Sequence, residues 1–387
     1  MRSTRRAWFG AVGHAELAGH ALLALTVTAA GSTRRAWFGA VGRARLLALV
    51  VRRLLAVPVV LFCLASLVFV AMRLLPGSPA TSLAVGGGSG SLSSSDLSQN
   101  EAKINAALGL DRSLASQYGT FLNDLLHLDL GSSFYGGNSI LGLLRGALPA
   151  TIELTIAAMT IAIVLGVATG VLAALRKDTW VDTLSRTVGT VSFSLPWFAL
   201  GVLGIVIFGV WLRWLPVIGR LPSQLDYHPT TNFILLDAIL QNRPELIWPW
   251  IQHLILPATT LALSMTGFIT RIVRASVLEV LGDDFVRTAR MKGLRPGAVL
   301  RRHVLRNSAL PITTVLGLQF GSLLGGSVIT ETVFSYPGVG SLLVHAIQQR
   351  DYPVVQGAAL AIALLFTLVN AAVDLFYLVL DPRLRKA

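Results

Sequence analysis

Six long apolar runs dominate this chain, and each approaches the length that a helix needs to cross a lipid bilayer. Crossing about 30 Å of hydrocarbon takes roughly 20 apolar residues, because only a helix satisfies its own backbone hydrogen bonds there. We therefore expect an all-α, polytopic membrane protein with six transmembrane helices. The expected spans are Leu54–Met72, Leu154–Leu175, Thr187–Leu212, His253–Thr270, Pro311–Thr330 and Val354–Leu380.

The composition agrees with a membrane environment. Hydrophobic residues make up 53% of the chain and charged residues only 13%, whereas soluble domains carry about 25% charged residues. The net charge of +13 raises the possibility of nucleic-acid binding. We expect none, because the Lys and Arg residues flank the apolar runs and do not form one basic face. A single cysteine, Cys63, excludes an internal disulfide framework.

The positions of the basic residues predict the orientation. Lys and Arg concentrate on the cytoplasmic side of membrane proteins. Most of the 32 lie in segments that share one side if the N-terminus is inside: Met1–Arg53, Arg176–Arg186, Arg271–Arg306 and the tail after Leu380. We expect both termini in the cytoplasm.

The expected outer loops differ in length. The first, residues 74–149, contains a Gly/Ser tract at Gly86–Ser95. The third, Phe334–Tyr352, carries a Pro-Gly pair that favours a tight re-entry. Apolar residues at helical spacing predict three short amphipathic helices in the first two loops: Ala102–Leu110, Ala115–His127 and Phe233–Leu240.

Residues 1–49 form an N-terminal extension before a transmembrane domain of residues 50–387. Its sequence STRRAWFGAVG occurs at residues 3–13 and again, identically, at residues 32–42. Two copies are too few for a solenoid. A signal peptide, a tandem duplication, a start placed too far upstream and an attachment to anionic lipid of the inner leaflet all remain open.

The segment from Asp283 to Pro311 is strongly basic and lies between two apolar runs. Asp283 and Asp284 suit the positive end of a helix, and Gly293 suits its left-handed C-terminal cap. A second helix is expected to start at Pro296 and to continue into the fifth span. Val286, Ala289 and Gly293 form a smooth face that we expect to lie in a groove of another protein. The alternative is a solvated basic loop near anionic lipid.

The residues of this segment, DDFVRTARMKGL followed by VLRRHVLRNSALP, resemble the cytoplasmic EAA-type loop of ABC importer permeases of the dipeptide/oligopeptide/nickel class. Other segments resemble that family in the same order, from about Val50 to the C-terminus: VRRLLAVPVVLF, RLLPGSPA, LGLDRSLASQYGTFLNDLLHLDLGSSF, ETVFSYPGVGSLLVHAIQQRDYPVVQGAAL and LDPRLR. There are departures: Ser78 replaces a common acidic residue, and Arg287-Thr288-Ala289 stands where Glu-Ala-Ala names the motif.

The resemblance implies a type I ABC importer permease fold and a transport subunit that is not itself an enzyme. Peptides are the implied cargo, with nickel, glutathione or haem as alternatives. The implied partners are a second homologous permease, two ABC ATPase subunits or domains and an extracytoplasmic solute-binding protein. No cofactor is expected in this chain, because ATP and Mg²⁺ would be bound by the partner subunits; the sequence has no G-x-x-x-x-G-K-[ST] motif.

The resemblance also implies which residues couple the permease to the ATPase. They lie in a cytoplasmic coupling loop, residues 271–309, where Arg287 and Arg290 would pair with acidic residues of the ATPase. The implied contact residues are Asp284, Phe285, Val286, Arg287, Thr288, Ala289, Arg290, Lys292, Gly293 and Leu294.

Polar residues inside the spans are candidates for the translocation pathway, because such groups are costly in a bilayer. These are Gln319, Asn370 and Asp374, and helix packing is the alternative role for each.

Three other functional classes fit the sequence less well. An intramembrane protease is not favoured, because the G-x-S-G pattern at Gly87–Gly90 lies in a Gly/Ser loop. The seven histidines show no metal-ligand spacing. A secondary transporter or channel stays a further alternative, although no repeat relates the two halves.

Overall fold

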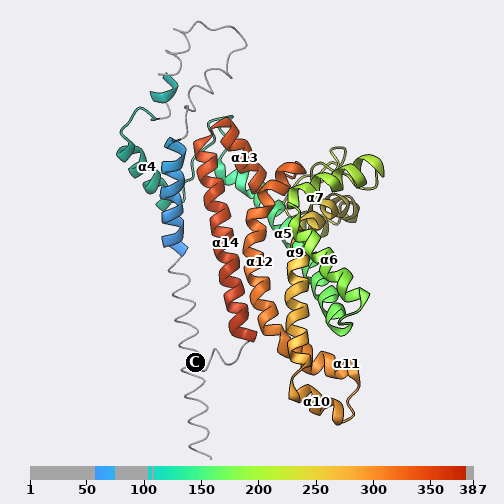
Figure 1. The fold of residues 1–387 in the computed structure, drawn as a ribbon. Helices are drawn as coiled ribbons and strands as arrows, with labels where there is room; N and C mark the ends of the chain where they lie inside the picture. The colour runs from blue at the N-terminus through green and yellow to red at the C-terminus, as the bar shows by residue number, and fades with distance from the viewer. Residues whose placement is uncertain (1–56, 75–102, 107–108, 381–387) are drawn as a thin grey trace, which may run out of the picture. The chain divides into compact units, whose positions relative to one another are not determined.

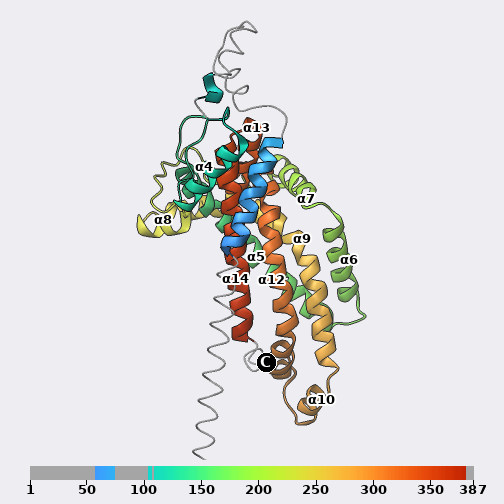
Figure 2. The same cartoon turned by 90° about the vertical axis from the view of Figure 1, so that its left-hand side faces the viewer.

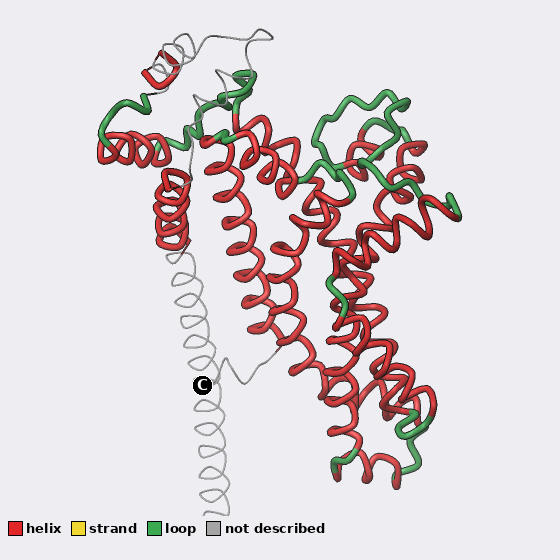
Figure 3. The backbone as a smooth tube through the Cα atoms, turned by 45° about the horizontal axis from the view of Figure 1, so that its top comes forward, coloured by secondary structure: helices red, strands yellow, loops and turns green. Residues whose placement is uncertain are grey.

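The computed structural model describes residues 57–74, 103–106 and 109–380. Within these ranges the chain is helices and loops, without a named strand (Figure 3). Residues Val57–Asp374 form one compact unit, to which the following description applies. The N-terminal extension, the Gly/Ser tract and the LDPRLR motif lie outside the described residues.

Two long helices form the centre of this unit. α5 covers Ile140–Leu175 and packs along α9, which covers Ile247–Leu281 (Figure 1). A Cβ atom added at Gly166 would lie only 2.6 Å from Ile269 Cγ2, so the small residue permits the close approach. Both helices begin earlier than the predicted spans: α5 continues through Pro149, and α9 begins at Ile247, before the predicted start at His253, and contains Pro257.

The third predicted span is wrong as a single straight helix. α6 covers Trp180–Ser194, and after a bend of 98° the chain continues as α7, Trp197–Gly204, and the π-helix η1, Ile205–Trp211. The break falls at Leu195 and Pro196. A residue before proline is disfavoured in the α region, and Leu195 is extended, with φ −87° and ψ 134°.

The remaining spans agree with the predicted positions. They are a helix at Val57–Leu74, α12 at Leu305–Val333 and α14 at Tyr352–Leu380. α12 contains a bend of 48°. By length and composition, four helices of the described chain can cross a membrane, and up to six if each bent pair is one span. Figure 2 shows the long helices from the side.

Short helices connect the spans. α4 at Leu114–Leu126 and α8 at Ile234–Leu240 confirm two predicted amphipathic helices. The third, predicted at 102–110, is helical at 103–106, and residues 102 and 107–108 lie outside the described chain. A three-residue 3₁₀ turn, η2 at Pro244–Leu246, precedes α9. The loop predicted as a tight re-entry contains an additional helix, α13 at Val339–Gln349.

Candidate functional site at the α10–α11 end

α9 and α12 are connected by two short helices. α10 covers Asp284–Met291 and α11 covers Pro296–Val299, followed by the π-helix η3 at Leu300–Val304. The predicted coupling loop, 271–309, is therefore mostly helical, and it contains helices at both predicted places. Only a few residues before α10, and the turn between α10 and α11, are non-helical.

The ends of α10 confirm the predicted local structure. Asp283 is the N-cap residue in an extended conformation, Asp284 occupies the first turn and Arg290 the last. These charges match the helix dipole. Gly293 has φ +75°, and a Cβ atom there would meet nothing within 4 Å. The backbone conformation, not a lack of space, therefore requires glycine at this position.

Two of the three residues of the face predicted to enter a groove of another protein are buried in this chain, whereas Gly293 is exposed. Val286 is fully buried and Ala289 is 6% exposed, in the same core as Val299 and Val304. A helix of two turns is unstable alone, so its apolar residues at i and i+3 anchor it to its own chain. The predicted close approach of a partner at Ala289 and Gly293 stays a prediction, and in this chain Ala289 is covered by its own core.

A different face of α10 is free. Met291 is 80% exposed, and Phe285 and Leu294 are each about two-fifths exposed at its edges. Arg287, Thr288 and the other polar residues of this surface are exposed as well. We call it the α10 outer face, defined by Asp284, Phe285, Arg287, Thr288, Arg290, Met291, Lys292 and Leu294. Large apolar groups beside basic residues are suited to protein contact.

This end of the molecule is rigidly connected to the long helices. The hydroxyl of Ser308 donates to the carbonyl oxygen of Ser276 at 3.2 Å, which joins the start of α12 to α9. From Pro296 the chain runs through helical turns to Val333. α10 is therefore linked along the chain to both α9 and α12.

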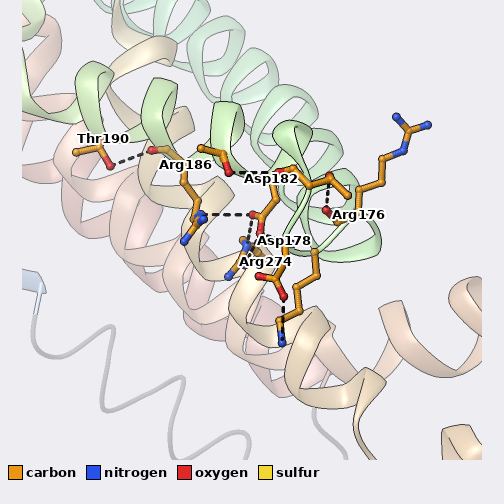
Figure 4. A network of polar contacts seen from close by, with 9 residues as sticks. Arg176, Asp178, Asp182, Arg186, Thr190 and Arg274 are labelled. Atoms are coloured by element: carbon orange, nitrogen blue, oxygen red, sulfur yellow. Dashed lines mark hydrogen bonds and ion pairs between the residues drawn. The ribbon is translucent and has the colours of Figure 1, made fainter.

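A buried ion pair joins α6 to α9 near the same end (Figure 4). Arg274 Nε and Nη2 donate to the two carboxylate oxygens of Asp182 at 2.6 and 2.7 Å. The backbone N–H of Asp178 donates to Asp182 at 3.1 Å, and Arg186 lies 3.6 Å away on the next turn. Asp182 is fully buried. The sequence analysis missed this pair, since its members are 92 residues apart.

A second buried polar group lies where the second predicted outer loop meets α5. Glu153 Oε2 accepts from Arg220 at 2.5 Å and from Trp250 Nε1 at 3.1 Å, and Oε1 accepts from the backbone N–H of Ile234 at 2.8 Å. Burial raises the pKa of the nearby Tyr336 phenol. These contacts fix the loop before α8 to the central helices. Sequence reasoning did not identify them.

The three predicted pathway residues come from α12 and α14. Gln319 and Asn370 are half-buried. The Asn370 amide oxygen would lie 3.5 Å from a Cβ atom added at Gly321, so Asn370 faces α12. The structure does not describe the side chain of Asp374. A role in the pathway stays a prediction for all three.

A family model and the relatives similar in sequence agree on one family. The family model for the binding-protein-dependent transport system inner membrane component matches residues 166–386. The chain is 39% identical to the dipeptide transport system permease protein DppB of Alkalihalophilus pseudofirmus, over 88% of this chain and 100% of that protein. It is 40% identical to the di/tripeptide transport system permease protein DppB of Pseudomonas aeruginosa, over 88% and 99%. A solved structure of the MetNI methionine ABC transporter aligns with a TM-score of 0.48 and 17% identity, over 62% of this chain and 98% of that chain.

Proposed function

Because the chain belongs to the family of inner membrane components of binding-protein-dependent transport systems, we propose that it is the permease subunit of an ATP-driven importer of short peptides. The observation that carries the proposal is the similarity to permeases named for dipeptides and tripeptides over nearly their full length. The chain provides the membrane path, and ATP and Mg²⁺ are bound by partner subunits.

The orientation follows from the distribution of charge. The α10–α11 end carries Arg287, Arg290, Lys292 and Arg295, and basic residues of loops are retained on the cytoplasmic side. With this end inside, both termini are inside as well. The α13 end, together with α4 and α8, then faces the extracytoplasmic solute-binding protein.

The α10 outer face is the proposed contact with the ATPase. It is exposed, combines apolar and basic groups, and is held by Val286 and Ala289 to a framework that includes α9 and α12. Movement of the ATPase would push α10 as a unit, and the two long helices would tilt with it. A second homologous permease and two ATPase subunits complete the proposed transporter.

The cargo is tested by uptake. A strain that lacks the gene is supplied with labelled dialanine, tetraalanine or Ni²⁺, with and without the gene on a plasmid. Peptide uptake that depends on the gene is the expected result. Gene-dependent uptake of Ni²⁺ with none of either peptide would overturn the peptide assignment and leave the family unchanged.

The ATPase contact is tested by cross-linking. Cys63 is the chain's one cysteine, and Cys63→Ser gives a background without reactive thiols. Met291→Cys on the α10 outer face is expected to cross-link to the ATPase in assembled membranes. Leu126→Cys on α4 is a matched control, because its exposure of 83% is close to the 80% of Met291. Cross-linking of the ATPase from Leu126 and not from Met291 would refute both the contact and the orientation.

A further inference from the structure

A cavity of about 320 Å³ opens between the Val57–Leu74 helix, α4 and the start of α14. This volume is in the range of small-ligand sites. The residues that matter for its chemistry are Arg73, Gln117, Asp124, Asp129, Tyr352 and Gln356. None of them belongs to the α10–α11 end.

Arg73 brings a positive charge to this cavity and forms no ion pair with a carboxylate of the described residues. Its guanidinium carbon lies 3.7 Å from the ring centroid of Phe69 and 5.6 Å from that of Tyr352. Nη2 donates to Gln117 Oε1 at 2.9 Å, whereas Nε and Nη1 are buried and have no hydrogen-bond partner in the described part of the chain. A partly buried cation of this kind gains from an anion that enters the cavity.

Gln356 is a second group that lacks a partner. It lies in the first turns of α14, lines the cavity and is only 8% exposed. Its Nε2 atom makes no hydrogen bond to any described residue. A buried amide donor without an acceptor is costly and uncommon in native proteins. Arg73 and Gln356 therefore both present hydrogen-bond donors to this cavity that an oxygen acceptor could pair.

The cavity also has carboxylates on its wall. Asp124 belongs to α4, and Asp129 follows it in the loop. One oxygen of Asp129 accepts from the backbone N–H of Gly131 at 2.8 Å, and the other is available. A ligand with a carboxylate and an ammonium group would match the donors of one wall and the carboxylates of the other.

We propose that this cavity binds a short zwitterionic peptide on the α13 side of the transporter, with the peptide carboxylate against Arg73 and Gln356 and its amine towards Asp124 and Asp129. The choice of a peptide, and not another zwitterion, rests on the proposed function. The carboxylate contact rests on the unpaired groups alone. Such a site would hold cargo beside the spans before translocation.

The test is ligand binding to the full-length chain in lipid nanodiscs, followed by saturation-transfer NMR. The probes are dialanine, dialanine amide and free alanine. Dialanine is expected to bind, and the amide to bind at least 10-fold more weakly because it lacks the carboxylate. Weaker binding of alanine than of dialanine supports a peptide site, whereas equal binding of the two shows that the site does not select peptides and overturns the peptide assignment.

Three variants test whether dialanine binds in this cavity. Arg73→Gln is expected to weaken dialanine binding at least 10-fold. Thr120→Phe removes no core contact, since Thr120 is exposed on the cavity wall, and it is expected to block the site by filling it. Arg145→Gln removes an exposed charge outside the cavity and is expected to leave binding unchanged.

Three results would overturn the proposal: no binding to the wild type, equal binding of acid and amide, or binding unaffected by both Arg73→Gln and Thr120→Phe. Peptide uptake by cells is measured separately. Uptake of peptide without binding to this cavity refutes the site and retains the proposed function. Binding without uptake retains the site and refutes the proposed function.

Discussion

The carboxylate of Glu331 on α12 accepts a hydrogen bond from the hydroxyl of Thr151 on α5, with 2.7 Å between Oε1 and Oγ1. Its second oxygen accepts from the backbone N–H of Ser341, in the first turn of α13, at 3.0 Å. Thr151 in turn accepts from the backbone N–H of Val339 at 2.9 Å. One fully buried carboxylate therefore joins two long helices to the start of a short one.

Glu331→Ala is expected to lower the free energy of unfolding by about 2–4 kcal/mol, because it leaves several buried donors without an acceptor. Glu331→Gln keeps the shape and one acceptor oxygen, so its loss is expected to be smaller. Thermal unfolding of the purified chain in detergent measures both. An alanine variant as stable as the glutamine variant would contradict this role of the carboxylate.

The ion pair between Asp182 and Arg274 is expected to show strong coupling in a double-mutant cycle. Asp182→Asn or Arg274→Met alone leaves one buried or partly buried charge without its partner, and a loss of about 3 kcal/mol is expected for each. The double variant should lose less than the sum of the two. Additive losses in melting experiments would show that the two side chains act independently.

The loop before α8 is expected to loosen in acid. Burial tends to raise the pKa of the Asp237 carboxyl, but hydrogen bonds from Tyr227, Thr231 and backbone N–H groups hold this pKa below its usual value. A lowered pKa in the folded state stabilises the loop above the usual Asp pKa, about 3.9, and this stabilisation is lost as the pH falls through the folded-state pKa.

Pepsin digestion measures this loosening, because the enzyme is active across the relevant range. Cleavage near Phe233 is expected to be slow at pH 5 and to increase as the pH approaches 3. Asp237→Asn has no carboxylate to protonate, so its cleavage relative to an unstructured peptide should not change over this range. The same pH profile for both proteins would assign the loosening to another group.

Much of the fold could be predicted from the sequence, because the relevant signals are local. Hydropathy located the spans, and the cap residues Asp283 and Gly293 located the ends of α10. Proline had effects that depend on its surroundings: Pro149 and Pro257 lie within continuous helices, whereas Pro196 follows a sharp break. The neighbouring packing, which the local sequence does not record, decides between these outcomes.

The candidate site was predicted only in part. Local spacing showed that Val286 and Ala289 share a face of α10, but which neighbour covers that face depends on residues that come later in the chain, such as Val299 and Val304. The buried carboxylates were missed for the same reason. Glu331 and Thr151 are 180 residues apart, and nothing near either one indicates the other.

The two faces of α10 are expected to respond in opposite ways to the same new charge. Val286→Asp places a carboxylate in a fully buried position without a partner, so it should reduce the amount of folded chain in the membrane. Met291→Asp places it on the α10 outer face, where water solvates it, so folding should be unaffected.

Met291→Asp is nevertheless expected to reduce peptide uptake at least 10-fold, because it puts a charge in the proposed ATPase contact. Quantitative immunoblots of membranes and uptake assays on the same cells separate the two effects, with Met291→Leu as the control that keeps the apolar surface. Normal uptake by Met291→Asp would show that the ATPase does not contact this face.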